Sequence, residues 1–186
     1  EEAMLRYGTD KPDLRNPLII HDVSKIFIRD DVRFDIFKNL VKKGNNVRCI
    51  VTKQTKAQPR SFFDNIDKWA KTEGSSGMAY FTIEKTQKVT AKGPIGKFFS
   101  EDSLIQLMED TGAKEGDSIF FSCGETKDIE KLLSSARQKI AHDLNLVDNS
   151  SFAFCWIVDY PMFEIDESDN KIKFSHNPFS MPQGNL

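Results

Sequence analysis

The sequence predicts an α+β fold of two layers, with helices on one face of a mostly antiparallel sheet. The first reason is the order of apolar patterns in the middle of the chain, which runs strand, helix, two strands, helix, strand, helix. The second reason is composition. A chain of 186 residues with 39% hydrophobic and 29% charged residues is typical of a soluble globular protein of one or two domains. With 15 phenylalanines, aromatic packing should dominate the core.

The strands are predicted from short apolar runs. They are expected at residues 18–20, 32–37, 47–51, 78–83, 87–91 and 117–124. The last of these is apolar almost throughout, which predicts a buried strand. The run at 87–91 follows 78–83 closely enough to pair with it as a hairpin. Residues 22–29 are expected to be helical or irregular.

The helices are predicted from apolar residues at helical spacing and from capping residues at their ends. They are expected at residues 1–7, 59–72, 100–112 and 127–145. Pro59 suits a first helical turn, and Ser100 followed by Glu101 and Asp102 gives a capping residue with an acidic first turn. The last helix has one continuous apolar face, formed by Ile129, Leu132, Leu133, Ala136, Ile140, Ala141 and Leu144. Because an unpaired carboxylate inside this face would be costly, Leu133→Asp should unfold the domain.

The loop at residues 9–17 contains two prolines and alternating charges. We expect a structural role for it, with Asp side chains closing local turns and the prolines fixing the backbone direction. Contact of Asp10, Lys11 or Arg15 with a ligand is the less favoured alternative, because no partner acid or base is evident nearby.

Two histidines and the three cysteines carry no clear signal of a site. His21 is expected to be a hydrogen-bonded surface or turn residue, and His142 lies off the apolar face of its helix and should face solvent. Cys49, Cys123 and Cys155 are widely spaced, with no Cys-x-x-Cys pair. We expect them to be reduced and buried, as in a cytosolic protein.

The last third of the chain contains the pattern that most resembles a site. Residues 152–158 form an apolar run that is too short to span a membrane and has the length of a fully buried strand. After an acidic turn, Ile172 and Phe174 alternate with lysines, which predicts an antiparallel return strand. Such a hairpin would place His176 at the end of a buried sheet. From spacing alone, a histidine in this position is more often structural than functional.

Two stretches resemble a known enzyme family. Residues 155–163, Cys-Trp-Ile-Val-Asp-Tyr-Pro-Met-Phe, followed by His176-Asn177-Pro178-Phe179, resemble the segment ahead of the last catalytic motif in bacterial-type aspartyl-tRNA synthetases. Residues 6–15, Arg-Tyr-Gly-Thr-Asp-Lys-Pro-Asp-Leu-Arg, resemble the segment that leads from the family's catalytic domain into its large insertion. The middle of the chain resembles that insertion, the GAD domain, which also occurs in the B and E subunits of tRNA-dependent amidotransferases.

The resemblance implies a domain organisation. Residues 1–28 and 146–186, the latter a hairpin, would be pieces of the antiparallel catalytic sheet of a class II synthetase, and residues 29–145 would be the GAD-like insertion domain. The chain would then be an internal fragment of an aspartate–tRNA ligase. The family also implies a cytoplasmic location, a homodimer and no membrane segment.

The resemblance implies a reaction as well. Enzymes of this family use ATP and Mg²⁺ to activate L-aspartate as aspartyl-adenylate, and they transfer the aspartyl group to tRNA-Asp. Whether tRNA-Asn is a second acceptor stays open. The family's phosphate-binding arginine and most of its acids for the metal and the ammonium group match no residue of this chain. The fragment is therefore expected to bind no cofactor and to be inactive alone.

One site residue carries over from the family. His176 matches the histidine that contacts the aspartate substrate, and a hydrogen bond from its ring to the substrate carboxylate would help to select aspartate over asparagine. Asn177 stands where many relatives have a second histidine, and an amide cannot become charged. Asp159 and Ser180 are candidates for positioning the site, although a buried aspartate at a strand end and a serine in a turn would explain them equally well. No residue is predicted to bind a metal.

Charge is unevenly distributed along the chain, although the net charge is only −2. Residues 33–97 contain fourteen Lys and Arg against five Asp and Glu, a local charge of +9. Residues 98–186 contain seven against sixteen, a local charge of −9. A basic half is compatible with RNA contact, and a solvated lysine-rich surface is the commoner explanation. Two alternatives to an enzyme fragment stay open: a non-catalytic GAD-type tRNA-binding module of an amidotransferase-like protein, and a structural spacer.

Overall fold

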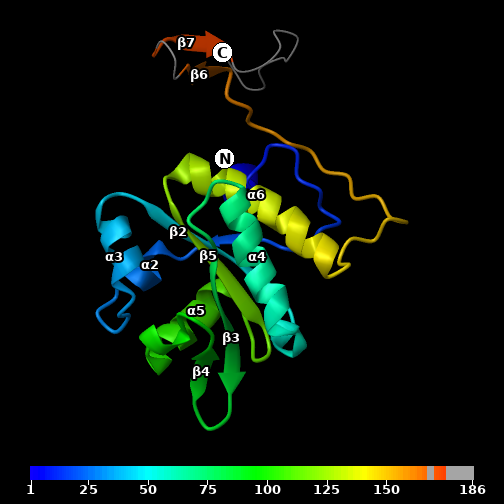
Figure 1. Ribbon diagram of the computed structural model, residues 1–186. Coiled ribbons are helices and arrows are strands. Elements are labelled where there is room, and N and C mark those ends of the chain that lie inside the picture. Colours follow the sequence, from blue (N-terminus) through cyan, green and yellow to red (C-terminus); the bar gives the residue numbers. More distant parts are fainter. Residues whose placement is uncertain (167–169, 175–186) are drawn as a thin grey trace. The chain divides into compact units, whose positions relative to one another are not determined.

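An antiparallel sheet of five strands forms the centre of the unit Glu2–Phe154, and a second unit begins at Cys155 (Figure 1). The computed structural model describes residues 1–166 and 170–174. The strands are β1 (Ile20–Asp22), β2 (Asn46–Thr52), β3 (Ala79–Lys85), β4 (Val89–Lys92) and β5 (Ser118–Gly124). They lie in the order β1-β2-β5-β3-β4, and every neighbouring pair is antiparallel. The predicted α+β class with an antiparallel sheet is confirmed.

The helices of this unit agree with the strongest sequence patterns. They are α1 (Glu2–Tyr7), α2 (Ser24–Phe27), α3 (Asp35–Lys42), α4 (Arg60–Thr72), α5 (Glu101–Thr111) and α6 (Thr126–Asp143), with short 3-10 turns η1 (Thr55–Ala57) and η2 (Gly96–Phe98). The predicted cap of α5 is confirmed, because the Ser100 hydroxyl accepts a 3.0 Å hydrogen bond from the Ser103 backbone N–H. Gly112, at φ +66°, ends the helix in the left-handed conformation that glycine adopts readily.

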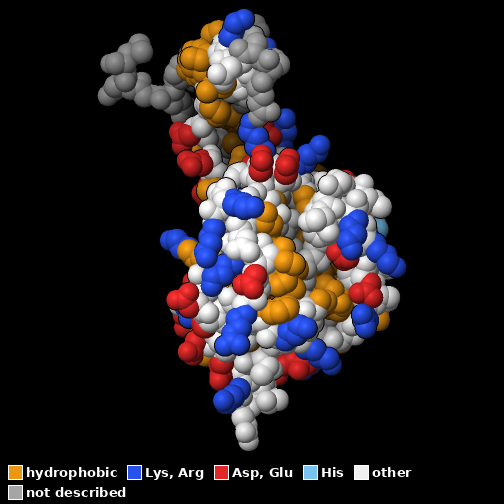
Figure 2. Space-filling model, turned by 60° about the vertical axis from the view of Figure 1, so that its left-hand side comes forward, with side chains coloured by type: hydrophobic (Ala, Val, Ile, Leu, Met, Phe, Trp, Pro, Cys, Tyr) orange, Lys and Arg blue, Asp and Glu red, His pale blue; other side chains and the backbone are white. Residues whose placement is uncertain are grey.

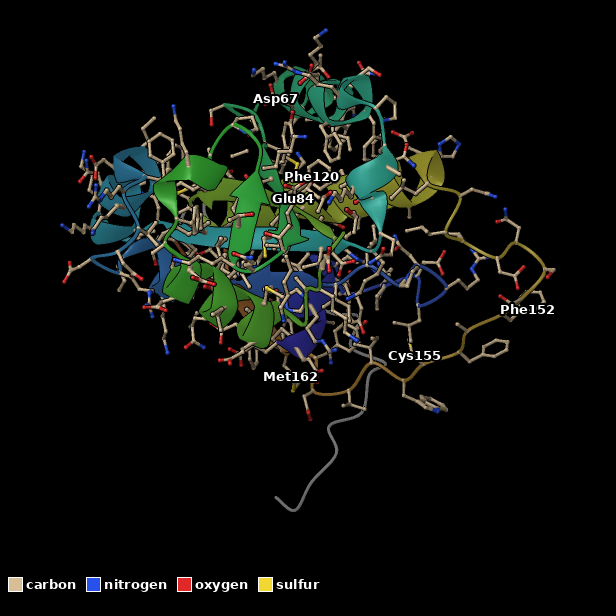
Figure 3. All side chains as sticks on the ribbon, turned by 90° about the horizontal axis from the view of Figure 1, so that it is seen from below. Asp67, Glu84, Phe120, Phe152, Cys155 and Met162 are labelled. Atoms are coloured by element: carbon tan, nitrogen blue, oxygen red, sulfur yellow. The ribbon has the colours of Figure 1, made fainter. Side chains whose placement is uncertain are left out.

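The sheet is covered by helices on both of its faces, so the predicted two-layer arrangement with helices on one face is wrong. Figure 3 shows α4 and α5 on opposite sides of the sheet. Phe121 and its neighbours pack on one face with α2, α3 and α5, and Phe120 packs on the other with α4 and α6. Successive side chains of a strand point to opposite faces. Because both of these rings are apolar, each face requires its own cover, and the unit has three layers.

The strand predicted at residues 32–37 is also wrong. Only Val32 forms an isolated bridge, with Phe99, and the helix α3 begins at Asp35. Phe34 and Phe37 pack around Phe27, with ring centroids 6.4 Å and 5.3 Å from it. A helical turn brings residues three apart to the same side, so the helix satisfies both aromatic contacts.

The unit that begins at Cys155 contains a small hairpin. Its strands are β6 (Phe163–Ile165) and β7 (Ile172–Phe174), which pair antiparallel with Phe163 opposite Phe174. The predicted return strand is thus confirmed at residues 172–174.

The fully buried strand predicted at residues 152–158 is wrong for this chain. The segment is not a strand, and Phe154 and Trp156 are 93% and 94% exposed. A strand needs neighbours for its backbone hydrogen bonds, and no described strand pairs with this segment. Figure 3 shows Phe152 projecting from it. Cys49 is buried as predicted, Cys123 is half-buried, and Cys155 is exposed, so the prediction of burial fails for the last.

Candidate functional site

The residues of the predicted aspartate contact lie mostly outside the described part of the chain. His176, Asn177 and Ser180 belong to residues 175–186, so their roles stay predictions. Asp159 is described, and it is exposed in a left-handed conformation at φ +57°. The expectation that it is a buried residue at a strand end is wrong, because the segment before it forms no strand.

A hollow of about 550 Å³ opens between the start of α4, the turn η1 and the β3–β4 edge of the sheet. We call it the basic hollow. It is lined by Lys56, Gln58, Arg60, Phe63, Tyr80, Thr82, Glu84, Lys92, Gly93 and Pro94. Segments separated by more than thirty residues of sequence meet here, because the sheet places β3 and β4 beside η1 and α4. The hollow is therefore a product of the tertiary fold.

Two stacked aromatic rings form the floor of the basic hollow. The Phe63 and Tyr80 rings lie 4.8 Å apart and nearly parallel, at 16°. They are 5% and 9% exposed, so their faces are turned into the protein. Burial, followed by the neighbouring Asp64 carboxylate, raises the pKa of the Tyr80 phenol. The floor is thus an apolar surface, and the Tyr80 phenol in it stays neutral.

Three cations from three different elements stand around this floor. Lys56 comes from η1 and forms a 3.2 Å ion pair with Glu84. Arg60, at the start of α4, is 86% exposed and lies 3.4 Å from Asp64. Lys92 is exposed at the end of β4. Guanidinium and ammonium groups in such a position can bind an anion from solvent.

The register of the β3–β4 hairpin places Lys92 at the basic hollow. Lys92 is directly opposite Thr82, so both side chains lie on the face of the sheet that α4 covers. Gly93 then turns the chain with φ +157°. A Cβ atom at this residue would lie 2.7 Å from the Cα of Phe81, so glycine permits the close approach to β3.

The basic half of the sequence does not form a separate basic surface on the face that Figure 2 displays. Lys and Arg side chains are scattered there among Asp and Glu. The fold mixes charges that the sequence keeps apart: Arg48 of the basic half, for example, forms a 2.9 Å ion pair with Glu130 of the acidic half. Anion binding therefore requires a local group of cations such as the one at the basic hollow.

The loop at residues 9–17 forms local structure, as predicted. The Asp13 carboxylate accepts hydrogen bonds from the Arg15 backbone N–H at 3.0 Å and from its Nε at 2.9 Å, which closes the turn. Lys11 donates its backbone N–H to the Thr9 hydroxyl at 3.2 Å. A polar hollow of about 540 Å³ lies beside this loop, and Arg137 of α6 is among its lining residues.

Arg137 is the buried residue that joins α6 to the chain's N-terminal segment. It is 2% exposed, and its Nε donates to the Leu18 carbonyl at 2.7 Å. Its Nη2 donates to the Asn16 carbonyl at 3.3 Å, and its guanidinium lies 4.9 Å from the centre of the Tyr7 ring. Burial lowers the pKa of Arg137. All of these contacts are internal, so the role of the residue is structural.

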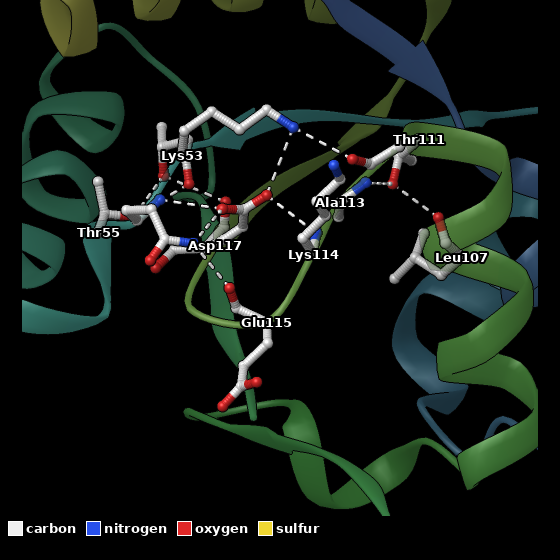
Figure 4. Close-up of polar contacts among 12 residues, drawn as sticks. Lys53, Thr55, Leu107, Thr111, Ala113, Lys114, Glu115 and Asp117 are labelled. Carbon is white, nitrogen blue, oxygen red and sulfur yellow. Dashed lines mark hydrogen bonds and ion pairs between the residues drawn. The ribbon is translucent and has the colours of Figure 1, made fainter. Parts of the chain in front are cut away.

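Asp117 is the centre of the polar network that Figure 4 shows. It is 1% exposed and accepts 2.9 Å hydrogen bonds from the backbone N–H groups of Gln54 and Lys114. Lys53 lies 3.4 Å from the carboxylate and also donates to the Gly112 carbonyl at 3.1 Å. The carboxylate joins the loops at the ends of β2 and α5 and is satisfied by protein partners. It is therefore a structural residue.

Other titratable groups in the described residues form no evident reactive cluster. No group of three or more His, Cys, Asp or Glu side chains in residues 1–166 and 170–174 could hold a metal ion. His142 is 89% exposed, as predicted. His21 lies half-buried in β1, where burial and then Arg6 and Lys53 lower its pKa. No described helix is long and apolar enough to cross a bilayer.

The convergence of Lys56, Arg60 and Lys92 was not predicted from the sequence. Each residue is an ordinary surface cation in its own segment, and only the strand order and the β3–β4 register bring them together. Arg137 was missed for a different reason. It lies next to the predicted apolar face of α6, between Ala136 and Ile140, and an arginine next to such a face is usually read as solvated.

Comparison with known proteins finds relatives that share one name. The chain is 69% identical over all 186 residues to an aspartate–tRNA(Asp/Asn) ligase of Pelagibacter ubique, and 49% identical over 186 residues to one of Beijerinckia indica. It is 48% identical over 182 residues, 97% of its length, to one of Methylorubrum populi. The chain spans 31%, 31% and 30% of the lengths of these relatives.

The central part of the chain also matches a domain family. Residues 37–133 match the family model of the GAD domain. This range starts in α3, ends within α6 and contains four of the five strands of the sheet, β2 to β5. With more than half of its residues matched and an antiparallel α+β fold over that range, the chain belongs to the GAD domain family.

Proposed function

We propose that this chain is a segment of an aspartate–tRNA ligase that activates L-aspartate with ATP and transfers it to tRNA. The observation that carries the proposal is the 69% identity over the whole chain to a relative with that name, of which the chain spans 31%. The names of the relatives give both tRNA(Asp) and tRNA(Asn), so tRNA-Asp, with tRNA-Asn as a second acceptor, is the proposed partner. A cytoplasmic homodimer is part of the same proposal.

The proposed organisation places residues 29–145 in the GAD insertion and residues 1–28 and 146–186 in the catalytic domain, with β1 (Ile20–Asp22) of the first segment added as an edge strand to the sheet of the insertion. The exposed apolar run at 152–158 supports this assignment. Burying a ring such as Phe152, Phe154 or Trp156 contributes roughly 1.5–3 kcal/mol, so a segment with several exposed rings is suited to pairing inside a larger sheet. The rest of a synthetase catalytic domain would provide such a sheet.

His176 is proposed to contact the aspartate carboxylate in the complete enzyme, with Asn177, Asp159 and Ser180 as candidates for positioning it. A histidine ring donates a hydrogen bond to a carboxylate when it is neutral and forms a stronger, charge-assisted one when it is protonated. Asparagine offers the site an amide in place of the carboxylate and would lose this interaction.

ATP and Mg²⁺ belong to the proposed complete enzyme. The described residues do not fit a metal site, because they contain no suitable cluster of His, Cys, Asp or Glu. No step of the reaction is therefore assigned through a metal in this chain. The chain alone is proposed to be inactive.

Aspartate-dependent exchange between ATP and pyrophosphate tests the proposal. The complete protein that contains this chain should catalyse the exchange, and the 186-residue chain alone should not. A complete protein without exchange would contradict the ligase assignment, and it would favour the alternative of a non-catalytic tRNA-binding module. Exchange by the isolated chain would contradict its proposed inactivity.

A substitution at His176 tests the proposed substrate contact. In the complete enzyme, His176→Ala should raise the KM for aspartate and lower kcat/KM by roughly 10- to 1000-fold, the range for loss of a charge-assisted hydrogen bond. His142→Ala is the matched control, because His142 is an exposed residue of α6. Equal values of kcat/KM for the two variants would remove His176 from the site.

A further inference from the structure

We propose that the basic hollow binds the phosphate backbone of RNA. The inference rests on the proposed function, in which tRNA is a substrate, and adds the surface of the GAD insertion that contacts it. The surface is the group Lys56, Arg60 and Lys92 around the Phe63–Tyr80 floor.

The three cations are placed to meet a ligand from solvent. Arg60 is 86% exposed and Lys56 is 49% exposed at the side chain, and Lys92 is exposed as well. Lys88, in the β3–β4 turn, is also exposed and adds a positive charge to the tip of the same hairpin. A string of separate cations matches the spaced charges of a nucleic acid backbone better than it matches a single small anion.

The acids beside the hollow do not block such a ligand. Glu84 and Asp64, the partners of Lys56 and Arg60, are 28% and 43% exposed at the side chain. Ion pairs between solvent-accessible side chains stabilise a protein only weakly, so a phosphate can replace a carboxylate as the partner of Lys56 or Arg60 at small cost. Lys92 forms no ion pair with any described residue.

The floor of the hollow indicates which part of the RNA is bound. Single-stranded bases are held by exposed aromatic faces on which they stack. The Phe63 and Tyr80 rings stack on each other and are 5% and 9% exposed, so they offer no such face. The cations of the hollow therefore contact phosphates. The affinity for RNA should depend strongly on salt concentration and weakly on the RNA sequence.

The test measures tRNA affinity of the complete protein by fluorescence anisotropy at several salt concentrations between 50 and 200 mM. The variant is Arg60→Gln with Lys92→Gln. The matched control is Lys42→Gln with Lys68→Gln, which removes two exposed lysines of the same basic half that do not line the hollow. Circular dichroism melting of each protein verifies the fold, and Lys92→Gln alone is a milder second variant.

We expect the double variant to lower the slope of log affinity against log salt by about 1.4–1.8, at ~0.7–0.9 per phosphate contact. At 50 mM salt this corresponds to an affinity roughly 100-fold lower, and Lys92→Gln alone should give about half of the change in slope. The control should keep the wild-type slope. A double variant that has the control's slope would overturn the proposal.

Two further outcomes distinguish a failure of the proposed ligase function from a failure of RNA binding at the hollow. If the complete protein fails to aspartylate tRNA, the proposed function fails, and the salt slopes still decide whether the hollow binds RNA. If the double variant binds tRNA like the control and raises the KM for ATP, the hollow holds a nucleotide phosphate, and the RNA proposal is overturned. Inorganic phosphate up to 10 mM, at constant ionic strength, should compete only weakly with tRNA, because one small anion does not replace the many charges of a nucleic acid backbone.

Discussion

Replacement of Arg137 by methionine should destabilise the unit Glu2–Phe154 and loosen its N-terminal segment. The guanidinium is 2% exposed, donates to the carbonyls of Leu18 and Asn16, and lies over the Tyr7 ring. Asn16 returns a hydrogen bond from its Nδ2 to the Arg137 carbonyl at 3.0 Å. Methionine fills a similar volume with an unbranched chain, so the substitution removes mainly the polar contacts.

The magnitude follows from these contacts. Two hydrogen bonds from a charged donor contribute about 1.5–3 kcal/mol each. The cost of burying the guanidinium opposes them, in agreement with the lowered pKa of Arg137. Loss of both bonds leaves two buried carbonyls without their donor, whereas loss of the buried charge is favourable. We expect a net decrease of about 2–4 kcal/mol in the free energy of unfolding.

Urea unfolding followed by circular dichroism measures this change, and hydrogen exchange of residues 7–18 locates it. Arg6→Met is the matched control. Arg6 is half-exposed and forms a surface ion pair with Glu2, so its replacement should cost less than about 1 kcal/mol. If Arg137→Met is as stable as the control and residues 7–18 exchange at the wild-type rate, the assignment of Arg137 as an anchor is incorrect.

Three more predictions concern titration, thiols and a turn. Hydrogen bonds from Arg29 lower the pKa of Asp31 to about 2, below the unfolded value of about 3.9. The stability from Asp31 is thus present above pH 4 and lost towards pH 2, so Asp31→Asn should reduce the fall in unfolding free energy over this window. Burial raises the pKa of Cys123 to about 11, whereas Cys155 is exposed, so maleimide at pH 7 should label Cys155 at least about tenfold faster. Gly93→Ala should cost roughly 1–3 kcal/mol in thermal melts, because its Cβ would meet the backbone of β3 at 2.7 Å; an unchanged melting temperature would contradict this.

Local patterns predicted the elements whose signals lie within one segment. The cap at Ser100 and the apolar face of α6 are properties of consecutive residues, and both are confirmed. Residues 32–41 carry two periods at once. Val32, Phe34 and Ile36 alternate as in a strand, whereas Phe34, Phe37 and Val41 follow helical spacing. The helix is favoured because it packs Phe34, Phe37 and Val41 against the core that contains Phe27. This contact is made with another segment, so the local sequence pattern could not predict it.

The cover on both faces could have been predicted from the strands. Residues 49–51 and 119–121 are continuous apolar runs whose successive side chains point to opposite faces, and such runs are typical of sheets with helices on both sides. The basic hollow could not have been predicted in this way. Lys56, Arg60 and Lys92 come together through strand order and hairpin register, which are properties of the whole fold.

The central strand β5 has a mechanical consequence. Phe120 and Phe121 are adjacent in sequence, yet one belongs to the core under α4 and α6 and the other to the core under α2, α3 and α5. A sideways displacement of this strand would disturb both cores at once, and close-packed interiors resist such shifts. We therefore expect the two helical layers to melt together, and the unit Glu2–Phe154 to move as one stiff body.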